Sequence, residues 1–370
     1  ALAAIGLPAL VKPEHGGGGK GMQRIERAEQ LGPAVAAAQR IAAAAFASDR
    51  LFLERLVLQA RHVEVQVLAD SHGNVMHVSE RECSLQRRHQ KVVEESPCSA
   101  LNAAERAAIC ASGRAFAAGI GYVGAGTVEF LFDPIRREHY FLEMNTRLQV
   151  EHPVTEVVNG VDLVMAQLAI ARGARLDEIP GLSPQPTPRG HAVEARIYAE
   201  DPASGYLPQV GTLVRLRWPD GPFVRVDSGF EQGDTVGVHY DPMLAKIIAW
   251  GANRDQALDR LRAALRQTVI HGVVTNIPML LHILDRPEVR AGEMHTGSLA
   301  EFWGESGPGA GEELDAVSAV ALAAVGHGGP LAGANGAQSN GNMATEHGLV
   351  DPWQHLGPVR VGGGAGGKAS

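Results

Sequence analysis

Between Glu143 and Glu151 every second side chain is ionisable or an amide, and this alternation is the strongest constraint on the fold. The five residues concerned are Glu143, Asn145, Arg147, Gln149 and Glu151. Successive side chains of an extended strand point to opposite faces, so we expect these five to line one side of a single strand. Met144, Leu148 and Val150 would then point the other way, into a core.

An upstream segment predicts a partner for this strand. Residues 127–132 have the composition of a second strand, and residues 133–138 would join the two. If this loop is symmetric about Arg136, Glu129 lies directly across from Glu143. Like charges placed opposite each other are destabilising, so a bridging cation such as Mg²⁺, with nucleotide phosphates completing its shell, would explain the pair. The alternative is one solvated face of an antiparallel sheet; we favour a metal–nucleotide site.

Composition narrows the class of protein. The chain has 370 residues, enough for two or three domains, with 45% apolar residues and a net charge of −8. No apolar run has the length of a membrane span, and the acidic balance argues against a general nucleic-acid binder. Cys83, Cys98 and Cys110 have no paired spacing, so neither a disulfide framework nor a zinc site is expected. No secretory signal follows Ala1, so a reducing, cytoplasmic compartment is predicted for what we take to be a processed or partial chain.

The order of predicted elements favours an α+β fold over a regular parallel sheet. Further strands are expected at residues 7–12, 51–58, 62–68, 75–78, 191–198 and 211–217. Helices are expected at residues 33–47, 102–118, 162–172 and 253–268. Asn102 and Glu105 form a capping box at the start of one of them. Residues 180–188, with four prolines, are interpreted as a linker or long loop. Residues 304–370, rich in Gly and Ala, are expected to be a poorly ordered linker with one short helix near 312–325.

A glycine run near the start could bind phosphate. Gly16, Gly17, Gly18 and Gly19 offer backbone N–H groups that no Cβ obstructs. The run is not a P-loop, because Gly21 rather than Ser or Thr follows Lys20. Lys12, at the end of the preceding strand, could reach an α- or β-phosphate, and a flexible turn is the alternative interpretation.

Two other segments carry clustered polar groups. Residues 86–91 read Gln-Arg-Arg-His-Gln-Lys, and such a run is usually a basic surface loop. Its place between apolar segments favours an inward-facing anion pocket, where Lys91 with Arg147 opposite would suit a small planar anion. In the strand that starts at His191, alternation puts Glu194 and Arg196 on one face.

Taken together, these segments resemble the biotin carboxylase family. The matching stretches are Lys12 with residues 16–22, and residues 61–70, 80–95, 124–130, 143–156, 191–196, 240–246 and 275–276. They keep a consistent order over residues 7–303. Residues 121–126 and 145–153 look most like α subunits of methylcrotonyl-, geranyl- and propionyl-CoA carboxylases.

The resemblance implies an ATP-grasp fold and a ligase activity. A lid subdomain would cover residues 1–57, the catalytic core 58–180 and the biotin carboxylase C-terminal subdomain 181–303. The implied reaction is ATP-dependent: bicarbonate, MgATP and biotin give carboxybiotin, ADP and phosphate through carboxyphosphate.

The resemblance also implies roles for individual residues. ATP would be held by Lys12, Gly16, Gly17, Gly18, Gly19, Glu54, His62, Gln86, His89 and Leu131. Mg²⁺ or Mn²⁺ would be held by Glu129, Glu143 and Asn145. Bicarbonate would be seated by Lys91, Arg147, Gln149 and Val150. Glu151 would be its general base, and Arg196 would steady the biotin enolate, which makes Glu151, Arg147, Lys91 and Arg196 the implied catalytic residues.

Departures from the family pattern keep other interpretations open. The family has an N-terminal domain of roughly a hundred residues, and this chain is expected to start after it. Pro13 and Glu14 stand where the family has small residues, and Lys368 does not lie between methionines as a biotin-bearing lysine would. Biotin is therefore expected on another chain or a missing segment. Implied partners are a biotin carboxyl carrier domain, a carboxyltransferase subunit and further copies of the chain, without nucleic acid or membrane. The alternatives are another ATP-grasp ligase and a catalytically silent assembly partner.

Overall fold

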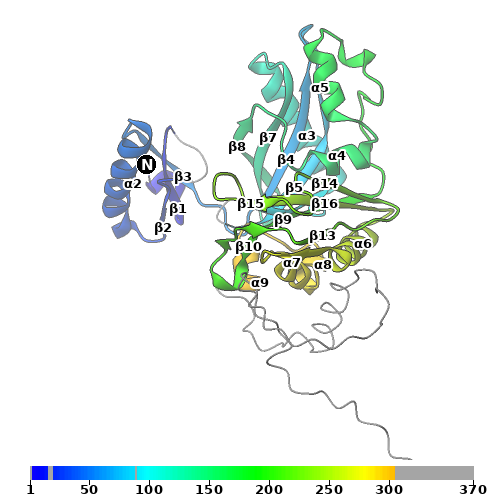
Figure 1. Ribbon diagram of the computed structural model, residues 1–370. Coiled ribbons are helices and arrows are strands. Elements are labelled where there is room, and N and C mark those ends of the chain that lie inside the picture. Colours follow the sequence, from blue (N-terminus) through cyan, green and yellow to red (C-terminus); the bar gives the residue numbers. More distant parts are fainter. Residues whose placement is uncertain (1, 16–19, 88–89, 305–370) are drawn as a thin grey trace, which may run out of the picture. The chain divides into compact units, whose positions relative to one another are not determined.

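The structure is a computed structural model that describes residues 2–15, 20–87 and 90–304 (Figure 1). Three predictions lie outside these residues: the phosphate-binding role of the glycine run at 16–19, the role of His89, and the character of the segment from Glu305 onward with its short helix.

A small three-stranded antiparallel sheet with the order β2-β1-β3 forms the N-terminal part. Its elements are α1 (Leu2–Ile5), β1 (Ala9–Pro13), β2 (Gln23–Ile25), η1 (Ala28–Gln30), α2 (Leu31–Phe46) and β3 (Leu51–Arg55). Ala9 and Val11 alternate along β1, and both are fully buried with Ala38 of α2. The alternation that predicted a strand here therefore also supplies the face that packs on the helix.

An eight-stranded antiparallel sheet dominates the described residues, with the order β14-β16-β9-β6-β5-β4-β7-β8 (Figure 1). Its strands are β4 (Arg61–Ala69), β5 (Val75–Arg87), β6 (Gln90–Ser96), β7 (Gly124–Asp133), β8 (Glu138–Asn145), β9 (His191–Tyr198), β14 (Val224–Ser228) and β16 (Met243–Gly251). Because β6 pairs with β9, the sheet runs across residue 180. The domain boundary proposed there stays a prediction.

Helices cover both faces of this sheet. They are α3 (Ala103–Gly119), α4 (His152–Asn159), α5 (Leu163–Ala171), α6 (Arg254–Gln267), α7 (Ile277–Leu284), α8 (Pro287–Arg290) and α9 (Ser298–Trp303). On one face, Val63, Val65 and Val67 of β4 pack with α3, and Val193, Ala195 and Ile197 of β9 pack with α6. On the other face, α4 packs over Ala192 and Ile248, and α5 packs over Leu68. The residues of β4 and β9 that alternate with these valines therefore face α4.

Short elements complete the described part. They are η2 (Leu176–Glu178), β10 (Glu200–Asp201), η3 (Pro202–Ser204), β11 (Leu207–Pro208), β12 (Gly211–Thr212), β13 (Arg215–Arg217), β15 (Thr235–Val236) and β17 (Val269–His271). The strand predicted at 211–217 is thus divided into β12 and β13, which pair with β15 and β17 respectively.

Helix caps were predicted well. The Asn102 side chain accepts from the Glu105 N–H at 3.0 Å, and the Glu105 carboxylate accepts from the Asn102 N–H at 2.8 Å, which confirms the capping box. Asn253 likewise accepts from the Gln256 N–H at 3.0 Å at the start of α6. Caps satisfy the free N–H groups of a first turn, so they fix where a helix begins.

The prediction of one strand through Glu151 is wrong beyond Asn145. The chain leaves the sheet after β8, turns, and enters α4, whose cap residue is Glu151. Pro153 lies in the first helical turn, where its missing N–H and fixed φ favour a helix start. Val154 and Val158 then bury the apolar side of α4. The alternation seen in the sequence therefore spans two different backbone geometries.

No single helix among the described residues combines the length and hydrophobicity needed to cross a membrane. The consecutive helices α4 and α5 reach that length and composition only as a pair, bent by 97°.

Candidate active site

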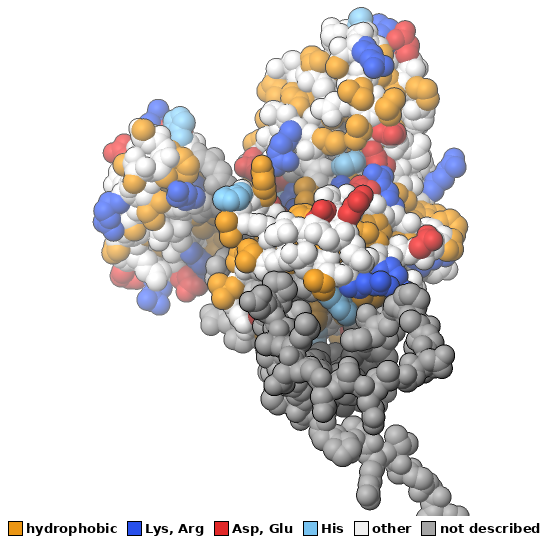
Figure 2. Space-filling model, viewed as in Figure 1, with side chains coloured by type: hydrophobic (Ala, Val, Ile, Leu, Met, Phe, Trp, Pro, Cys, Tyr) orange, Lys and Arg blue, Asp and Glu red, His pale blue; other side chains and the backbone are white. Residues whose placement is uncertain are grey.

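The charges that distinguish this molecule are inside it. Figure 2 shows acidic and basic side chains interspersed over the visible face. In contrast, a set of ionisable side chains that are at most 9% exposed lies between the sheet face under α4 and the start of α4. We call this set the charged cluster; it contains Glu64, Arg81, Lys91, Glu94, Glu129, Glu151, Glu194 and Arg196. Burying charge is strongly unfavourable unless it is paired, so the pairing within the cluster is informative.

Lys91 is held by three carboxylates. Its Nζ donates to Glu64 at 2.5 Å, to Glu129 at 2.8 Å and to Glu151 at 2.7 Å, which uses all three ammonium protons. Burial alone would lower the pKa of Lys91, but Glu64 and its other acidic neighbours raise it well above the ordinary value. Lys91 is therefore a permanent cation at the centre of the cluster.

A β-bulge puts Lys91 on this face. Lys91 pairs with Gln86 of β5, whereas Val93, two residues further on, pairs with Leu85. Two residues of β6 thus correspond to one step of β5, and the extra residue reverses the alternation. Val93 packs in the apolar core with α6, and Lys91 faces the opposite side.

Glu151 lies between two cations. One carboxylate oxygen accepts from Lys91, and the other accepts from the Arg196 guanidinium at 3.0 Å. Arg196 also donates to Glu94 at 2.5 Å. Burial opposes the charge of Arg196, but Glu94 and Glu151 raise its pKa. The predicted placement of Glu194 and Arg196 on one face agrees with the pairing of β9, in which Arg196 is opposite Lys246 and Glu194 is opposite Glu94.

The turn between β8 and α4 carries the other predicted bicarbonate residues, Arg147, Gln149 and Val150, and they have different surroundings. Gln149 donates to Glu129 at 3.0 Å, and the Val150 carbonyl accepts from the Lys246 ammonium. Arg147 is exposed and donates to the carbonyl of Leu148 at 3.3 Å. Among the described residues it forms no hydrogen bond or ion pair with the charged cluster.

Arg81 is a residue that the sequence interpretation missed. It is fully buried and makes five hydrogen bonds. Its acceptors are Glu64 at 2.6 Å, Gln66 at 2.7 Å, Thr155 at 3.0 Å, Thr127 at 3.2 Å and Gln149 at 3.3 Å. Burial raises the pKa of Glu64, but Lys91 and Arg81 together hold it at about 2. No site role was predicted for Glu64 either, and nothing in the polar run around Arg81 indicated burial.

The predicted metal ligands lie on the β7–β8 hairpin. Glu129 is directly opposite Glu143, as expected. The hairpin loop is not symmetric about Arg136, because Asp133 pairs with Glu138. A bulge in β8, between the Phe130–Phe141 pair and the Glu129–Glu143 pair, shifts the register by one residue and so places Glu129 opposite Glu143 as predicted. Asn145 donates to Glu129 at 3.0 Å through its amide nitrogen, which leaves its amide oxygen for another ligand.

This donor set fits a hard cation. Two facing carboxylates and an amide oxygen are ligands that Mg²⁺ accepts, and Glu143 is exposed, so the site opens to solvent. Burial raises the pKa of Glu129, but His62 and Lys91 lower it well below the ordinary value, which keeps it ionised. Two other acid groupings, Glu129 with His62 and Glu64, and Glu64 with Cys83 and Glu151, could also surround a metal ion by distance. In both, the ammonium of Lys91 already bonds to two of the carboxylates.

The predicted nucleotide residues fall into two sets. In the N-terminal sheet, Lys12 donates to Glu54 at 2.9 Å. In the large sheet, His62 is paired with Leu131 of β7, and the Gln86 amide lies 3.5 Å from the His62 ring nitrogen. The structure therefore brings three predicted adenine or ribose contacts onto neighbouring strands.

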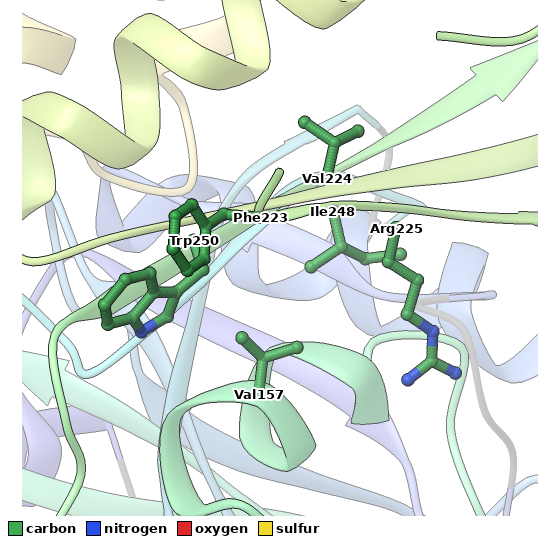
Figure 3. Close-up of a pocket in the computed structure, with 6 residues that line it drawn as sticks. All are labelled: Val157, Phe223, Val224, Arg225, Ile248 and Trp250. Atoms are coloured by element: carbon green, nitrogen blue, oxygen red, sulfur yellow. The ribbon is translucent and has the colours of Figure 1, made fainter. Parts of the chain in front are cut away.

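A surface cavity lies apart from these residues. It has a volume of about 330 Å³ and is lined by Val157, Phe223, Val224, Arg225, Ile248 and Trp250 (Figure 3). Its lining is apolar except for Arg225, which is bound to Glu156 at 2.7 Å and to Asp227 at 2.7 Å. A cavity of this character offers no acid–base chemistry.

Comparison with known proteins identifies the two halves of the described chain. Residues 1–179 match the family model for the carbamoyl-phosphate synthase L chain, ATP binding domain. Residues 194–301 match the model for the biotin carboxylase C-terminal domain.

Curated relatives are α subunits of acyl-CoA carboxylases. The mitochondrial methylcrotonoyl-CoA carboxylase subunit alpha of Oryza sativa subsp. japonica is 46% identical over 328 residues, covering 86% of this chain and 44% of the relative. The propionyl-CoA carboxylase alpha chain of Ruegeria pomeroyi is 41% identical, covering 87% of this chain and 50% of the relative. The chain thus spans about half or less of the length of these relatives.

Solved structures agree with the sequence matches. A biotin carboxylase–βγ-ATP complex from Campylobacter jejuni superposes with a TM-score of 0.76 at 38% identity, over 81% of this chain and 66% of that chain. The biotin carboxylase domain of Hydrogenobacter thermophilus 2-oxoglutarate carboxylase, bound to MgADP, ADP and bicarbonate, gives a TM-score of 0.76 at 40% identity, over 81% and 65% of the two chains. The chain therefore belongs to the biotin carboxylase family and has its ATP-grasp fold.

Proposed function

We propose that the chain is the biotin carboxylase component of an acyl-CoA carboxylase. It would be an ATP-dependent ligase that carboxylates protein-bound biotin with bicarbonate, through carboxyphosphate. The observation that supports this most directly is the position of Glu151, whose two oxygens are bound separately by Lys91 and Arg196. A carboxylate held between two cations can accept the proton of bicarbonate in the first step. It then lies beside the ureido group of biotin in the second step.

The first step needs positioning and charge neutralisation more than covalent chemistry. Bicarbonate would be seated by Lys91, Arg147, Gln149 and the backbone of Val150. Glu151 would accept its proton, so that a bicarbonate oxygen attacks the γ-phosphorus of ATP and ADP leaves. Lys91 would donate to the bicarbonate in place of one of its present carboxylate partners, and it would stay charged throughout because of its raised pKa.

Metal and nucleotide would lie next to this centre. Glu129, Glu143 and the amide oxygen of Asn145 would hold Mg²⁺ or Mn²⁺, which when bound neutralises phosphate charge. His62, Gln86 and Leu131 would contact adenine or ribose, and Lys12 with Glu54 would contribute from the N-terminal sheet. Carboxyphosphate reacts with water, so closure of the N-terminal part over the nucleotide would protect it.

Biotin would come from another polypeptide segment. Arg196 would stabilise the negative oxygen that develops on the ureido group when its nitrogen loses a proton. A biotin carboxyl carrier domain, a carboxyltransferase subunit and a homo-oligomeric assembly are proposed as partners, because the relatives are named as subunits and are about twice as long as the matched region. A cytoplasmic location stays a prediction.

The direct test is the stimulation of ATP hydrolysis. We expect phosphate release by the longest natural polypeptide containing this chain to require bicarbonate and to increase with free biotin. A rate of ATP hydrolysis that is independent of both bicarbonate and biotin would favour another ATP-grasp ligase. Turnover by that longer polypeptide but not by the 370-residue chain would instead identify the shorter chain as a catalytically silent fragment.

Changing Glu151 to Gln tests the proposed base. Removal of a general base lowers a rate by about 10²- to 10⁴-fold, so carboxylation should be lost while MgATP still binds in calorimetry. Glu231→Gln, at an exposed position remote in sequence from the cluster, is the control and should keep normal turnover. Normal carboxylation by Glu151→Gln would remove Glu151 from this role.

A further inference from the structure

Glu94 and Glu194, two carboxylates of the charged cluster, have no role in the mechanism above. Glu94 of β6 is directly opposite Glu194 of β9, and both side chains are completely buried. Side chains directly opposite on neighbouring strands have Cβ atoms about 4.5–5.5 Å apart. Arg196 donates to one oxygen of Glu94. The other oxygen of Glu94 and both oxygens of Glu194 have no hydrogen-bond partner among the described residues.

The surroundings do not compensate two negative charges here. Arg196 donates to Glu94 but to neither oxygen of Glu194, and it also donates to Glu151. Across β9, Glu194 is opposite Ile248, which packs with Val154 and Val158 of α4 in an apolar cluster. Ionisable groups that face the pair from the elements packed around it are Arg81, Cys83, Lys91, Glu151, His152, Glu156, Arg196, Tyr198 and Lys246. Of the cations, Lys91 is bound by three carboxylates, and Lys246 is bound by the Val150 carbonyl and lies 3.5 Å from Asp227.

We propose that Glu94 and Glu194 share one proton, carried by Glu194 and donated to the free oxygen of Glu94, and that the singly charged pair positions Arg196. A hydrogen bond of this kind satisfies a buried acceptor and a buried acid at once, which neither group achieves alone. The proposal rests on the proposed function, because Arg196 is there assigned to the biotin step.

The direction of the pKa shifts agrees with this arrangement. Burial raises the pKa of Glu94, Arg196 opposes that shift, and Glu151 adds to it. Burial and the neighbouring Glu94 raise the pKa of Glu194 well above the ordinary value. Two carboxylates that share a site titrate as a pair, with one proton retained to a much higher pH than usual.

The shared proton preserves the positive charge of Arg196. If both glutamates were ionised, Arg196 would be surrounded by three carboxylates, including Glu151. Its field at a developing oxyanion would then be largely cancelled. When Glu194 is neutral, Glu94 orients the Arg196 guanidinium through one hydrogen bond. The positive charge of Arg196 then remains available to stabilise the developing oxyanion. Glu94 and Glu194 are thus positioning residues, since they act through Arg196.

Infrared spectroscopy tests the proton without requiring turnover. At pH 7 we expect the protein to show the C=O stretching band of a protonated carboxylic acid, which shifts in D₂O and disappears in Glu194→Gln. Glu231→Gln is the control and should retain the band. A band unchanged in Glu194→Gln would overturn the proposal. Because glutamine has the shape of a protonated glutamate, failure of this variant to fold would also contradict it.

Kinetics test the positioning role. Glu94→Gln should raise the KM for free biotin or lower the kcat of biotin carboxylation by about tenfold, with bicarbonate-dependent ATP hydrolysis without biotin changed less than about twofold. Glu194→Gln, which has no proton to lose, should extend the alkaline limb of the pH profile of biotin carboxylation. Equal losses of both activities in Glu94→Gln, or an unchanged profile in Glu194→Gln, would argue against positioning. If the parent protein lacks bicarbonate-dependent hydrolysis, the proposed function fails, while the infrared result still decides the shared proton.

Discussion

At the scale of single residues, Arg81 explains how so many charges can be buried together. Its guanidinium binds side chains from β4, β7, α4 and the turn that precedes α4. A guanidinium presents five donors in a rigid plane, whereas a lysine has three on a flexible stem. Arg81 therefore fixes the β8–α4 turn, which carries Gln149 and Glu151, against the central strands.

We expect Arg81→Lys to lower the free energy of unfolding by roughly 3 kcal/mol, because buried acceptors lose charged donors. Urea unfolding followed by circular dichroism measures this. Arg215→Lys, at an exposed position, should change stability by less than about 0.5 kcal/mol. A loss for Arg81→Lys as small as the control would show that the network relaxes around the lysine.

The residue scale also shows what the sequence could predict. Lys91, Glu151 and Arg196 were expected from motif and resemblance, and the structure brings them into contact. Arg81 and Glu94 were not expected, because a charged residue in a polar run looks exposed until its neighbours are known. Burial of both faces of β5 depends on α3 and α4, which are separated from β5 along the chain.

At the scale of elements, local sequence signals predicted where helices begin, but the sequence did not predict where strands end. The capping asparagines located α3 and α6, because a cap involves only residues within one turn. The strand predicted at 75–78 continues to Arg87, since residues 80–82 are buried although they are charged. The bulge in β6 had no sequence signal, because it arises from pairing with β5.

Asp70 joins two elements by a set of hydrogen bonds. Its carboxylate accepts from the N–H groups of His72 and Asn74 in the β4–β5 turn, and from the Leu176 N–H of η2 at 2.9 Å. Burial raises the pKa of Asp70, but these bonds, with that from the Asn74 amide, lower it to about 2. Because the folded pKa is lower than the unfolded one, Asp70 stabilises the fold above about pH 4 and loses this effect as the pH falls towards 2.

We therefore expect Asp70→Asn to lower stability at pH 7 by about 2 kcal/mol, as bonds to a charged acceptor are lost. The difference from the parent protein should shrink as the pH is lowered from 4 to 2. Thermal unfolding at a series of pH values measures it. Asp220→Asn, at an exposed aspartate, is the control. A difference that is constant with pH would mean that the charge of Asp70 is irrelevant.

At the scale of the whole molecule, the two matched families share one sheet. The region matched as ATP-binding supplies β4 to β8, and the biotin carboxylase C-terminal region supplies most of β9 together with β14 and β16. The pairing of β6 with β9 joins them in the middle of the sheet. Without the other region, β6 or β9 would be an edge strand whose backbone N–H and C=O groups on that side are unpaired.

We expect fragments 2–183 and 184–304, expressed separately, to lack cooperative unfolding transitions, and a mixture of the two to regain one. Cutting the folded chain at a protease site introduced within residues 183–187 is the matched control and should leave the transition nearly intact. Calorimetry distinguishes these cases. A sharp transition for fragment 184–304 alone would show that it is an independent domain.

The β6–β9 pairing also has a consequence for the order in which the chain acquires its structure. Arg81 and Glu64 are 17 positions apart, Lys91 and Glu151 are 60 apart, and Glu94 and Arg196 are 102 apart. Closing longer loops costs more chain entropy, and synthesis proceeds from the N-terminus. During translation β6 is therefore an open edge until β9 emerges. We expect aggregation during translation or refolding to depend on how quickly β9 pairs with this edge. Variants that slow the pairing of β9 with β6 should therefore lower the yield of folded protein before they lower its free energy of unfolding.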